Sequence, residues 1–458
     1  MPDAHTPAGI ARTATDRMQA REHERYLREH PHCAAEAQRS ARHWLNGVPM
    51  HWMTDWGLPV PLVVRAAHAA TLEDIDGHRY VDFCLGDTGA MFGHSPAAVA
   101  EAIARQAQRG FTCMLPTEMT AHVGELLAAR FGLPCWQITQ TATDANRAVV
   151  RWARAVTGRD KVLVFDGCYH GSLEDTLVRL EHGRVVTRTG QVGSAVDFAA
   201  HARVVEFNDV DALEAALAHR DVACVLAEPV MTNAGMVLPQ DRFWSQVRAL
   251  CDQYSTLLAI DETHTLSSGP SGHARQIGLR ADLLVVGKAI AGGVPCAVYG
   301  FTADLTERMS RVLRDKPRGH SGMGTTLAAN QLATVVLAAC LEHVMTDAAY
   351  AHMTSLAAQL VTGLTAIVST RSLPWHVAGV GARTELCFSA VAPRTGRESL
   401  AAAVPELEHA LHLYLLNRGV LITPFHNMML VSPATTREQV QRLLDAIDAC
   451  CDELRKSA

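Results

Sequence analysis

Residues 257–293, LLAIDETHTLSSGPSGHARQIGLRADLLVVGKAIAGG, contain the pattern that decides the fold. Two short apolar runs, residues 257–260 and 283–286, lie on either side of a longer polar stretch, and each run is too short for a helix. Continuous apolar runs of this length are typical of strands that are buried on both faces of a sheet. Each run is followed by a polar side chain, Asp261 after the first and Lys288 after the second.

The same pattern extends outward along the chain. Apolar runs at residues 161–165 and 223–227 also end in polar or glycine residues, and longer helical patterns separate the runs. Strands that alternate with helices predict an α/β fold with a mainly parallel sheet and helices on both faces. Such a sheet binds ligands at the carboxyl ends of its strands, which is where these polar residues fall.

Asp261 and Lys288 have complementary chemistry. A lysine in apolar surroundings makes a good Schiff-base amine. A carboxylate at a strand end can bind a metal, act as a base or pair with a cationic ring. Taken alone, a lysine after a strand is more often a surface residue than a catalyst. The occurrence of both residues at neighbouring strand ends favours a shared site.

Two further segments carry candidate ligand-binding groups. Residues 140–146, QTATDAN, open a helical pattern over residues 147–156. Thr and Asp at a helix start are ordinary N-caps, but two hydroxyls with the backbone N–H groups of a helix N-terminus also form a phosphate site. Residues 167–171, GCYHG, follow a strand and present Tyr169 and His170 between two glycines. A glycine-bracketed tyrosine is a poor core candidate.

The flanking regions predict a second, smaller lobe. Residues 16–44 have the pattern of an exposed helix, residues 45–61 that of a loop, and residues 71–83 that of a hairpin with an Asp76-Gly77 turn. The predicted organisation is an N-terminal helix, loop and hairpin (residues 1–90, part of the small lobe), a large ligand-binding domain (91–345) and a C-terminal α+β domain (346–458).

Composition narrows the class of protein. The chain has 458 residues, of which 48% are hydrophobic, which is enough for a large core and too long for one simple domain. The net charge of -6 argues against a nucleic-acid scaffold. The twelve cysteines lack C-x-x-C and metal-type spacing, so we expect reduced core thiols and no metal site. We find no secretory signal and no run approaching the roughly 20 apolar residues of a membrane span, and expect a cytoplasmic protein without membrane contact.

Five strings, in order and at fitting spacing, resemble the class III aminotransferases. Among these, the chain is most similar to the glutamate-1-semialdehyde aminomutase-like members, from about residue 70 to the C-terminus. The strings are ITQTATDANRAVVRWARAVTGRDKVLVFDGCYHG (138–171), VLAEPV (225–230), LLAIDETHT (257–265), LLVVGKAIAGGVP (283–295) and GTTLAANQLA (324–333).

The resemblance implies the PLP-dependent transferase fold type I, pyridoxal 5'-phosphate as cofactor, and a homodimer with shared active sites. Lys288 matches the lysine that binds the cofactor as a Schiff base and shuttles the substrate proton. Asp261 matches the aspartate that keeps the pyridine nitrogen protonated. The other cofactor-binding positions implied by the resemblance are Thr141, Ala142 and Thr143 at the phosphate, Tyr169 stacked on the ring with His170 beside it, Glu228, Thr263, His264, and Thr326, which reaches the phosphate of the partner subunit.

The chain departs from the family pattern at three places. Ala142 replaces a glycine of the phosphate turn and Asp144 a glutamate, and an alanine at a position suited to positive φ alters the turn slightly. The loop at residues 48–53 lacks the arginine of the aminomutase-like members and places Trp52 and Met53 there, either in a substrate pocket or in packing at the domain junction. His426, near a position where relatives carry a glutamate, is either a substrate contact or a structural histidine. Arg383 is either a carboxylate anchor or a partner of Glu385.

These departures favour an aminotransferase that moves an amino group between an amine or amino acid donor and a keto acid, aldehyde or ketone acceptor. The alternative is intramolecular transfer of the glutamate-1-semialdehyde 2,1-aminomutase type. A non-catalytic homologue has little reason to retain the set of Lys288, Asp261 and Tyr169. A NAD-dependent dehydrogenase needs a G-x-G-x-x-G turn, which the sequence lacks.

Overall fold

The computed structural model describes residues 8–193 and 196–456, which form two compact units. Unit 1 contains the residues up to Ser95, Ala351–Ala392 and the residues from Ala402 onward; unit 2 contains Pro96–Tyr350 and Pro393–Ala401. The predicted boundaries at residues 90 and 345 fall a few residues before these divisions at 95 and 350. The short segment from Pro393 to Ala401 joins unit 2 from outside the predicted range.

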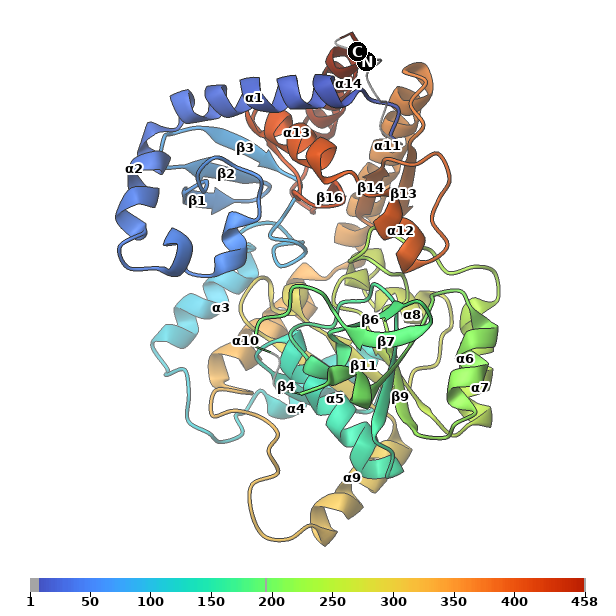
Figure 1. Cartoon of the computed structure of the whole chain (residues 1–458). Helices are drawn as coiled ribbons and strands as arrows, with labels where there is room; N and C mark the ends of the chain where they lie inside the picture. The colour runs from blue at the N-terminus through green and yellow to red at the C-terminus, as the bar shows by residue number, and fades with distance from the viewer. Residues whose placement is uncertain (1–7, 194–195, 457–458) are drawn as a thin grey trace. The chain divides into compact units, whose positions relative to one another are not determined.

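Unit 2 is built around a seven-stranded sheet with the order β4-β12-β11-β10-β9-β5-β8. Neighbouring strands are parallel except at β12, which runs antiparallel to β11 and to β4. The predicted mainly parallel sheet with surrounding helices is confirmed (Figure 1). The strands are β4 (Cys135–Thr139), β5 (Lys161–Phe165), β8 (Ala202–Val205), β9 (Val222–Ala227), β10 (Leu257–Asp261), β11 (Leu283–Val286) and β12 (Ala297–Phe301), with a separate hairpin of β6 (Val178–Glu181) and β7 (Arg184–Thr187).

The helices of unit 2 connect and cover these strands. They are α3 (Ala97–Ala107), α4 (Thr120–Phe131), α5 (Ala142–Thr157), α6 (Val210–Leu217), α7 (Phe243–Gln253), α8 (Gly272–Gln276), α9 (Ala303–Asp315), α10 (Gln331–Ala339) and most of α12 (Gly396–Ala402). In Figure 1, α5 lies in front of the sheet, and α6 and α7 lie together at one side.

Strand β5 illustrates why the strands are apolar at every position. Successive side chains of a strand point to opposite faces. Val162 and Val164 pack in one cluster with residues of α5, whereas Phe165 makes ring contacts with Phe207 at 5.1 Å and Phe243 at 5.7 Å. Because both faces are covered, neither set of positions tolerates polar residues.

Unit 1 contains two small sheets and the remaining helices. One sheet has the order β1-β2-β3-β15, and the other has the order β13-β14-β16. The strands are β1 (Val64–His68), β2 (Thr71–Asp74), β3 (Arg79–Asp82), β13 (His376–Val380), β14 (Arg383–Cys387), β15 (Val420–Leu421) and β16 (Met428–Leu430). The helices are α1 (Arg12–Glu29), α2 (Pro31–Ser40), α13 (Pro405–Leu416), α14 (Arg437–Lys456) and α11 (Asp347–Thr370), of which the first four residues belong to unit 2.

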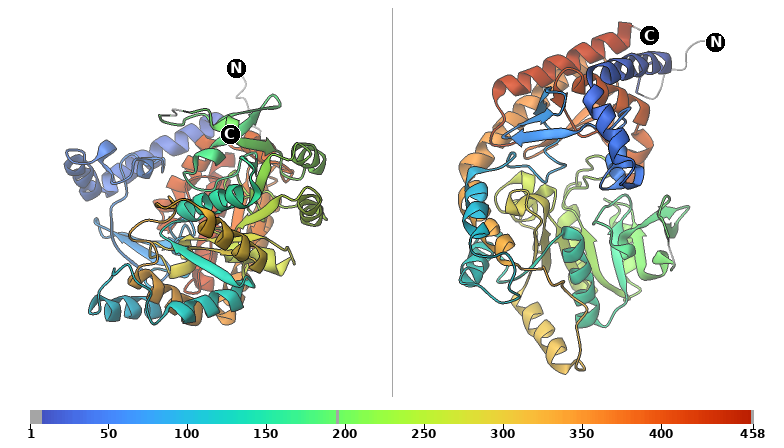
Figure 2. Two further views of the ribbon diagram at one scale, coloured as in Figure 1. Left: turned by 90° about the horizontal axis from the view of Figure 1, so that it is seen from below. Right: turned by 90° about the vertical axis from the view of Figure 1, so that its left-hand side faces the viewer.

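The predicted single exposed helix over residues 16–44 is wrong. The chain forms α1 and α2, separated at His30, whose φ of -122° and ψ of 53° are not helical. Pro31 has no N–H to continue α1 and disfavours a helical conformation in the residue before it. Nor is α1 fully exposed, because it buries Met18 and Tyr26 and packs against α13 (Figures 1 and 2).

The predicted hairpin over residues 71–83 is confirmed. β2 and β3 pair antiparallel, with Leu72 opposite Tyr80. Gly77 in the connecting turn has a φ of 91°, a conformation that glycine adopts at little cost.

Helix α11 corrects the expectation that no segment suits a membrane span. By length and composition, its 24 residues are long and apolar enough to cross a membrane. Its buried residues recur at helical spacing, Met353, Leu356, Leu360 and Leu364 among them, while Thr354, Ser355 and Thr362 are exposed. One apolar face and one polar face are typical of a helix that covers the core of a globular unit.

The cysteines agree with the prediction of reduced core thiols. All twelve are free, and all but Cys113, Cys135 and Cys387 are buried. Burial raises the pKa of several of these thiols, that of Cys296 to about 12, because the thiolate would lose its hydration. They serve as small apolar residues of the core.

Candidate active site

The carboxyl ends of four neighbouring strands of unit 2 carry the predicted catalytic and cofactor-binding side chains. Asp261 ends β10, Lys288 follows β11, and Glu228 follows β9. Tyr169 and His170 follow β5, which pairs parallel with β9. Because β11, β10, β9 and β5 are adjacent and parallel, these side chains gather at one edge of the sheet.

Asp261 lies at the centre of a buried hydrogen-bonded cluster and is 3% exposed. Its Oδ2 accepts hydrogen bonds from Asn146 Nδ2 at 2.8 Å and His170 Nδ1 at 3.0 Å, and its Oδ1 accepts one from the backbone N–H of Thr263 at 3.0 Å. Burial acts to raise the pKa of Asp261, but the hydrogen bond and charge of His170 outweigh it and lower the pKa to about 2. The side chain is therefore a carboxylate at physiological pH.

His170 is the cationic partner of this carboxylate. Burial acts to lower the pKa of His170, whereas the neighbouring Cys168 and Asp261 raise it to about 10. The two side chains form an ion pair that is almost completely buried. A buried ion pair of this kind needs further hydrogen bonds, and Asn146 and the Thr263 N–H provide them.

Lys288 occupies a backbone conformation that is rare for a residue with a side chain. It has a φ of 48° and follows Gly287 directly after β11. Such conformations cost on the order of 1–3 kcal/mol and persist where the surrounding structure fixes them, often at functional sites. Lys288 Nζ lies 2.8 Å from His264 Nε2, so the imidazole orients the amine.

Gly287 shows how closely three parts of the site approach one another. A Cβ added to this glycine would lie 2.8 Å from the Ala142 side chain and 3.4 Å from Thr263 Oγ1. The backbone next to Lys288 therefore packs closely against Ala142, the first residue of α5, and against Thr263. Only glycine leaves room for this approach.

The N-terminus of α5 has the features of an anion site. Thr141 is the N-cap, and its Oγ1 accepts a hydrogen bond from the Asp144 N–H at 3.2 Å and donates one to Asp144 Oδ2 at 2.9 Å. Thr143 Oγ1 accepts a hydrogen bond from the Ser172 N–H at 3.3 Å. The first N–H groups of a helix have no acceptor within the helix, and together with the helix dipole they attract a phosphate.

The expected alteration of the phosphate turn by Ala142 is wrong. Ala142 is the first residue of α5 and is not among the residues with positive φ. An alanine there costs no backbone strain and favours the helix. The position that does require glycine in this region is Gly171, with a φ of 80°.

Replacing Gly171 is expected to disturb the site. In Gly171→Ala, the new Cβ would lie 2.0 Å from Thr143 Oγ1 and 2.9 Å from Thr143 Cβ. We expect a loss of about 2–4 kcal/mol in the free energy of unfolding, from positive φ and overpacking together. Urea unfolding measures this loss, and equilibrium dialysis of the cofactor is expected to show weaker binding.

Gly183→Ala is the matched control for Gly171→Ala. Gly183 also has a positive φ, 75°, but an added Cβ meets nothing within 4 Å. We expect a loss of about 1–2 kcal/mol from the backbone alone, with unchanged cofactor affinity. Equal losses in both variants would contradict the steric contact with Thr143.

The other predicted cofactor-binding residues differ in exposure. Glu228 is 5% exposed and accepts a short hydrogen bond from Thr232 Oγ1. Tyr169 is 42% exposed, unlike the buried Glu228, Asp261 and His170. Thr326 is exposed and lines a cavity of about 440 Å³ in unit 2.

The four predicted substrate-binding residues all lie in unit 1. Trp52 and Met53 line an apolar cavity of about 650 Å³. Arg383 is buried and donates to Glu385 Oε1 at 2.9 and 3.1 Å, which agrees with the structural alternative for this residue. His426 Nδ1 lies 3.3 Å from the same Oε1, so its side chain also belongs to this buried cluster.

Two residues of the site were not singled out from the sequence. Asn146 is fully buried, at a position of α5 that lies among Ala145, Val149 and other core residues. A polar residue on the apolar face of a helix is a signal that it has a buried partner, here Asp261. Gly287 has no such signal, because its close contacts come from segments distant in the sequence.

The residues present fit pyridoxal phosphate by their chemistry. A phosphate group needs backbone donors and a helix dipole, which α5 provides. A protonated pyridine nitrogen needs a carboxylate that keeps its charge, which Asp261 provides. A carbonyl carbon needs a primary amine, which Lys288 provides.

The comparisons with known proteins agree with this fit. Residues 53–451 match the family described as aminotransferase class-III. The chain is similar to a glutamate-1-semialdehyde aminomutase from Pseudomonas aeruginosa PAO1, with 49% identity, coverage of 97% of this chain and 100% of that chain, and a TM-score of 0.95. A lysine-to-alanine form of that aminomutase has been solved in complex with PMP.

Two transaminases are also similar. A β-phenylalanine aminotransferase from Variovorax paradoxus has 26% identity, with 95% of this chain and 97% of that chain covered and a TM-score of 0.84. An omega-transaminase from Sphaerobacter thermophilus has 26% identity, with 92% and 98% covered and a TM-score of 0.84. The predicted PLP fold type I, the cofactor and the enzymatic nature of the chain are thereby confirmed. This protein is a pyridoxal-phosphate-dependent enzyme that belongs to the class III aminotransferases.

Proposed function

We propose that the enzyme transfers an amino group between two separate molecules, from an amine or β-amino acid with a bulky apolar group to a keto acid, aldehyde or ketone. The observation that carries this proposal is the character of residues 43–64, which contain three of the chain's tryptophans and neither lysine nor arginine. The aminomutase-like relatives that the sequence resembles bind a substrate carboxylate from this region. A segment without lysine or arginine favours substrates that do not depend on such an anchor.

The cavity formed by this segment supports an apolar ligand. Its volume is about 650 Å³, and its lining includes Trp44, Trp52, Met53 and Trp56. Glu36 is the charged residue among those that line it. Ligand pockets of this size are commonly lined by aromatic and apolar side chains, with a few polar groups that set orientation.

Arg383 also supports the proposal, because its charge is already used. The guanidinium is 2% exposed and paired with Glu385 inside unit 1. Removing one partner of a buried ion pair costs several kcal/mol. If Arg383 bound a substrate instead, the buried carboxylate of Glu385 would lose this partner. Arg383 is thus a structural residue in this proposal.

The chain's own residues then have defined roles. The bound cofactor supplies an electron sink for charge that develops on the substrate carbon. Lys288 Nζ takes the proton that leaves this carbon and returns it later, and His264, 2.8 Å away, orients the amine. Asp261 would balance the positive charge of the protonated pyridine nitrogen, and the N-terminus of α5 would bind the phosphate.

A homodimer is part of the proposal. The lining of the 440 Å³ cavity in unit 2 includes the exposed apolar side chains Met114 and Leu115 as well as Thr326, and the exposed Leu327 is the next residue in the chain. Exposed apolar side chains grouped at one place favour a protein interface. Thr326 would then contribute to the phosphate site of the partner subunit, as the family resemblance implies.

A donor screen tests the proposed reaction. Purified enzyme is supplied with aromatic amines, β-amino acids and α-amino acids, each with pyruvate or 2-oxoglutarate. We expect turnover that requires both a donor and an acceptor, and we expect Trp52→Ala to raise KM for the bulkiest donor about 10-fold with a smaller change in kcat. His51→Ala, an exposed neighbour, is the control.

The second candidate is intramolecular transfer of the aminomutase type. The 49% sequence identity to a glutamate-1-semialdehyde aminomutase, over 97% of this chain, favours it. Adding glutamate-1-semialdehyde to this screen without an acceptor separates the two candidates, because an aminomutase converts that compound without any acceptor. Activity on that compound alone would contradict the proposal of intermolecular transfer.

A further inference from the structure

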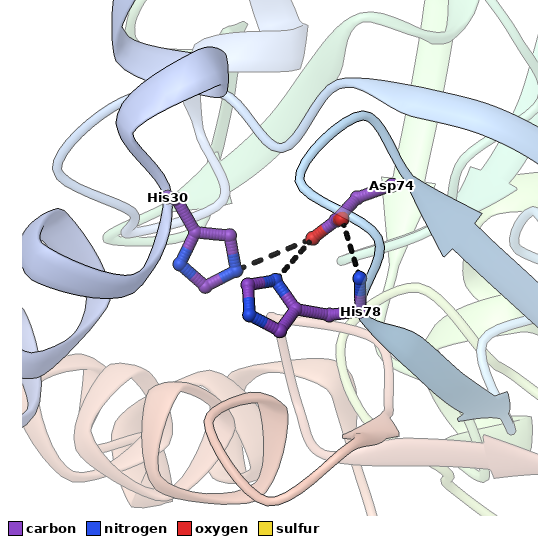
Figure 3. Close-up of side chains that lie close together, drawn as sticks. All are labelled: His30, Asp74 and His78. Atoms are coloured by element: carbon purple, nitrogen blue, oxygen red, sulfur yellow. Dashed lines mark hydrogen bonds and ion pairs between the residues drawn. The ribbon is translucent and has the colours of Figure 1, made fainter.

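His30, Asp74 and His78 of unit 1 form a compact group of metal-ligating side chains (Figure 3). His30 Nε2 lies 3.4 Å and His78 Nδ1 3.1 Å from the same oxygen, Asp74 Oδ2. One ligand atom from each of the three residues falls within 4.8 Å of the other two. Figure 3 shows the two imidazoles and the carboxylate directed toward one another.

The three residues come from different elements that unit 1 brings together. His30 separates α1 from α2, Asp74 ends β2, and His78 lies in the turn that leads to β3. The side chains of His30 and Asp74 are 3% and 0% exposed, whereas that of His78 is 40% exposed. The group is therefore closed on one side and open to solvent on the other.

The hydrogen bonds around the group leave the ligand atoms directed inward. His30 Nδ1 lies 2.7 Å from the backbone carbonyl oxygen of Tyr26, which can only accept, so Nδ1 carries a hydrogen and, in the neutral ring, Nε2 has a lone pair. Asp74 Oδ1 accepts from the His78 N–H at 2.9 Å, which fixes the carboxylate. A ligating histidine in proteins usually donates its other ring N–H to such an acceptor.

The hydroxyl of Tyr80 lies beside two of the proposed ligand atoms. Tyr80 Oη lies 2.8 Å from His30 Nε2 and 2.6 Å from Asp74 Oδ2, and its single hydrogen can satisfy one of them. A bound cation would satisfy the remaining lone pair and the buried carboxylate together.

We propose that His30 Nε2, Asp74 Oδ2 and His78 Nδ1 bind one zinc ion, with water in the fourth position on the exposed side of His78. Tetrahedral zinc with bonds of about 2.0–2.1 Å places ligand atoms about 3.3 Å apart, close to the 3.1 and 3.4 Å found here. Two imidazoles and one carboxylate suit zinc among the available divalent metals.

The site is structural, because it joins the α1–α2 junction to the β2–β3 hairpin within unit 1. The neighbouring group of Cys33, Asp74 and Asp76 is less suited, since Asp76 already accepts from the N–H groups of His32 and Cys33 at the start of α2. The sequence analysis predicted no metal site because the cysteines lack metal-type spacing, and residue 30 is distant from 74 and 78 in the chain. The fold of unit 1 brings the three residues together.

Zinc titration of the chelator-treated holoenzyme tests the proposal, with a chromophoric chelator as competitor. We expect one zinc per chain and, in His78→Ala, affinity weakened at least about 10-fold. His68→Ala removes an exposed histidine of β1 in the same unit and is expected to bind zinc as the wild type does. Zinc is also expected to raise the Tm of the wild type and of His68→Ala but not of His78→Ala.

His78→Asn provides a second variant that keeps a polar side chain in the turn. Cobalt gives an independent readout, since a tetrahedral site produces visible d–d absorption that both His78 variants are expected to lose. Absence of stoichiometric zinc in the wild type would overturn the proposal, as would equal affinity in His78→Ala and His68→Ala.

Discussion

Lys288→Ala is expected to lower kcat for amino-group transfer by at least about 10³-fold, the largest effect we predict for a single substitution. The side chain supplies both the covalent attachment of the cofactor and the amine that moves the substrate proton. No other described lysine can replace it, because Lys161 pairs with Asp221 at the start of β5 and Lys316 and Lys456 lie at exposed helix ends.

Two measurements separate loss of chemistry from loss of binding. Borohydride reduction followed by mass spectrometry is expected to find the cofactor covalently bound in the wild type and not in Lys288→Ala. Equilibrium dialysis is expected to find the variant still binding it, through the α5 terminus and Asp261. Lys316→Ala, at an exposed helix end, is the control. Multiple turnovers by Lys288→Ala would show that another residue moves the proton.

The fold was predictable because its strands are short and apolar on both faces. Each run ends at a polar residue or glycine, and each is too short for a helix. The prediction was less accurate for the N-terminal helices. Pro31 was visible in the sequence, but the charge pattern on both sides of it suggested one continuous helix.

The active site was predictable as a set of strand ends, and less so in its contacts. Asp261 and Lys288 follow adjacent parallel strands, so their proximity at one edge follows from the topology. The hydrogen bond from Asn146, the positive φ of Lys288 and the contact of Gly287 with Ala142 depend on tertiary packing. The expectation for Ala142 failed because the helix begins at residue 142 and not at the predicted residue 147, so Ala142 is helical.

Unit 1 was the least predictable part. Arg383 had two equally good explanations in the sequence, and only its burial against Glu385 distinguishes them. The grouping of His30 with Asp74 and His78 joins segments more than forty residues apart in the chain. Neither spacing nor composition reveals such contacts, because they arise from the packing of helices on a hairpin.

Asp261→Asn is expected to lower kcat by about 10²–10⁴-fold while leaving the fold intact. An amide has nearly the same shape as the carboxylate and retains one acceptor, but it has no negative charge to balance a protonated ring nitrogen. The wild-type carboxylate, with its pKa lowered to about 2, keeps this charge throughout the working pH range. Steady-state kinetics and the visible spectrum of the bound cofactor measure the change.

Asp166→Asn is the matched control, since Asp166 is also buried at the end of a strand, where its Oδ1 accepts from the Leu180 N–H at 2.8 Å. We expect near-normal kcat from that variant.

The pH dependence of unfolding gives a second readout. Because the folded-state pKa of Asp261 is lowered, its stabilisation is present above about pH 4 and is lost as the pH falls through 2. Because that of His170 is raised, its stabilisation is present below about pH 6.5 and is lost as the pH rises through 10. Asp261→Asn is expected to lose both dependences together, and a variant that kept either would show that the buried charges are paired differently.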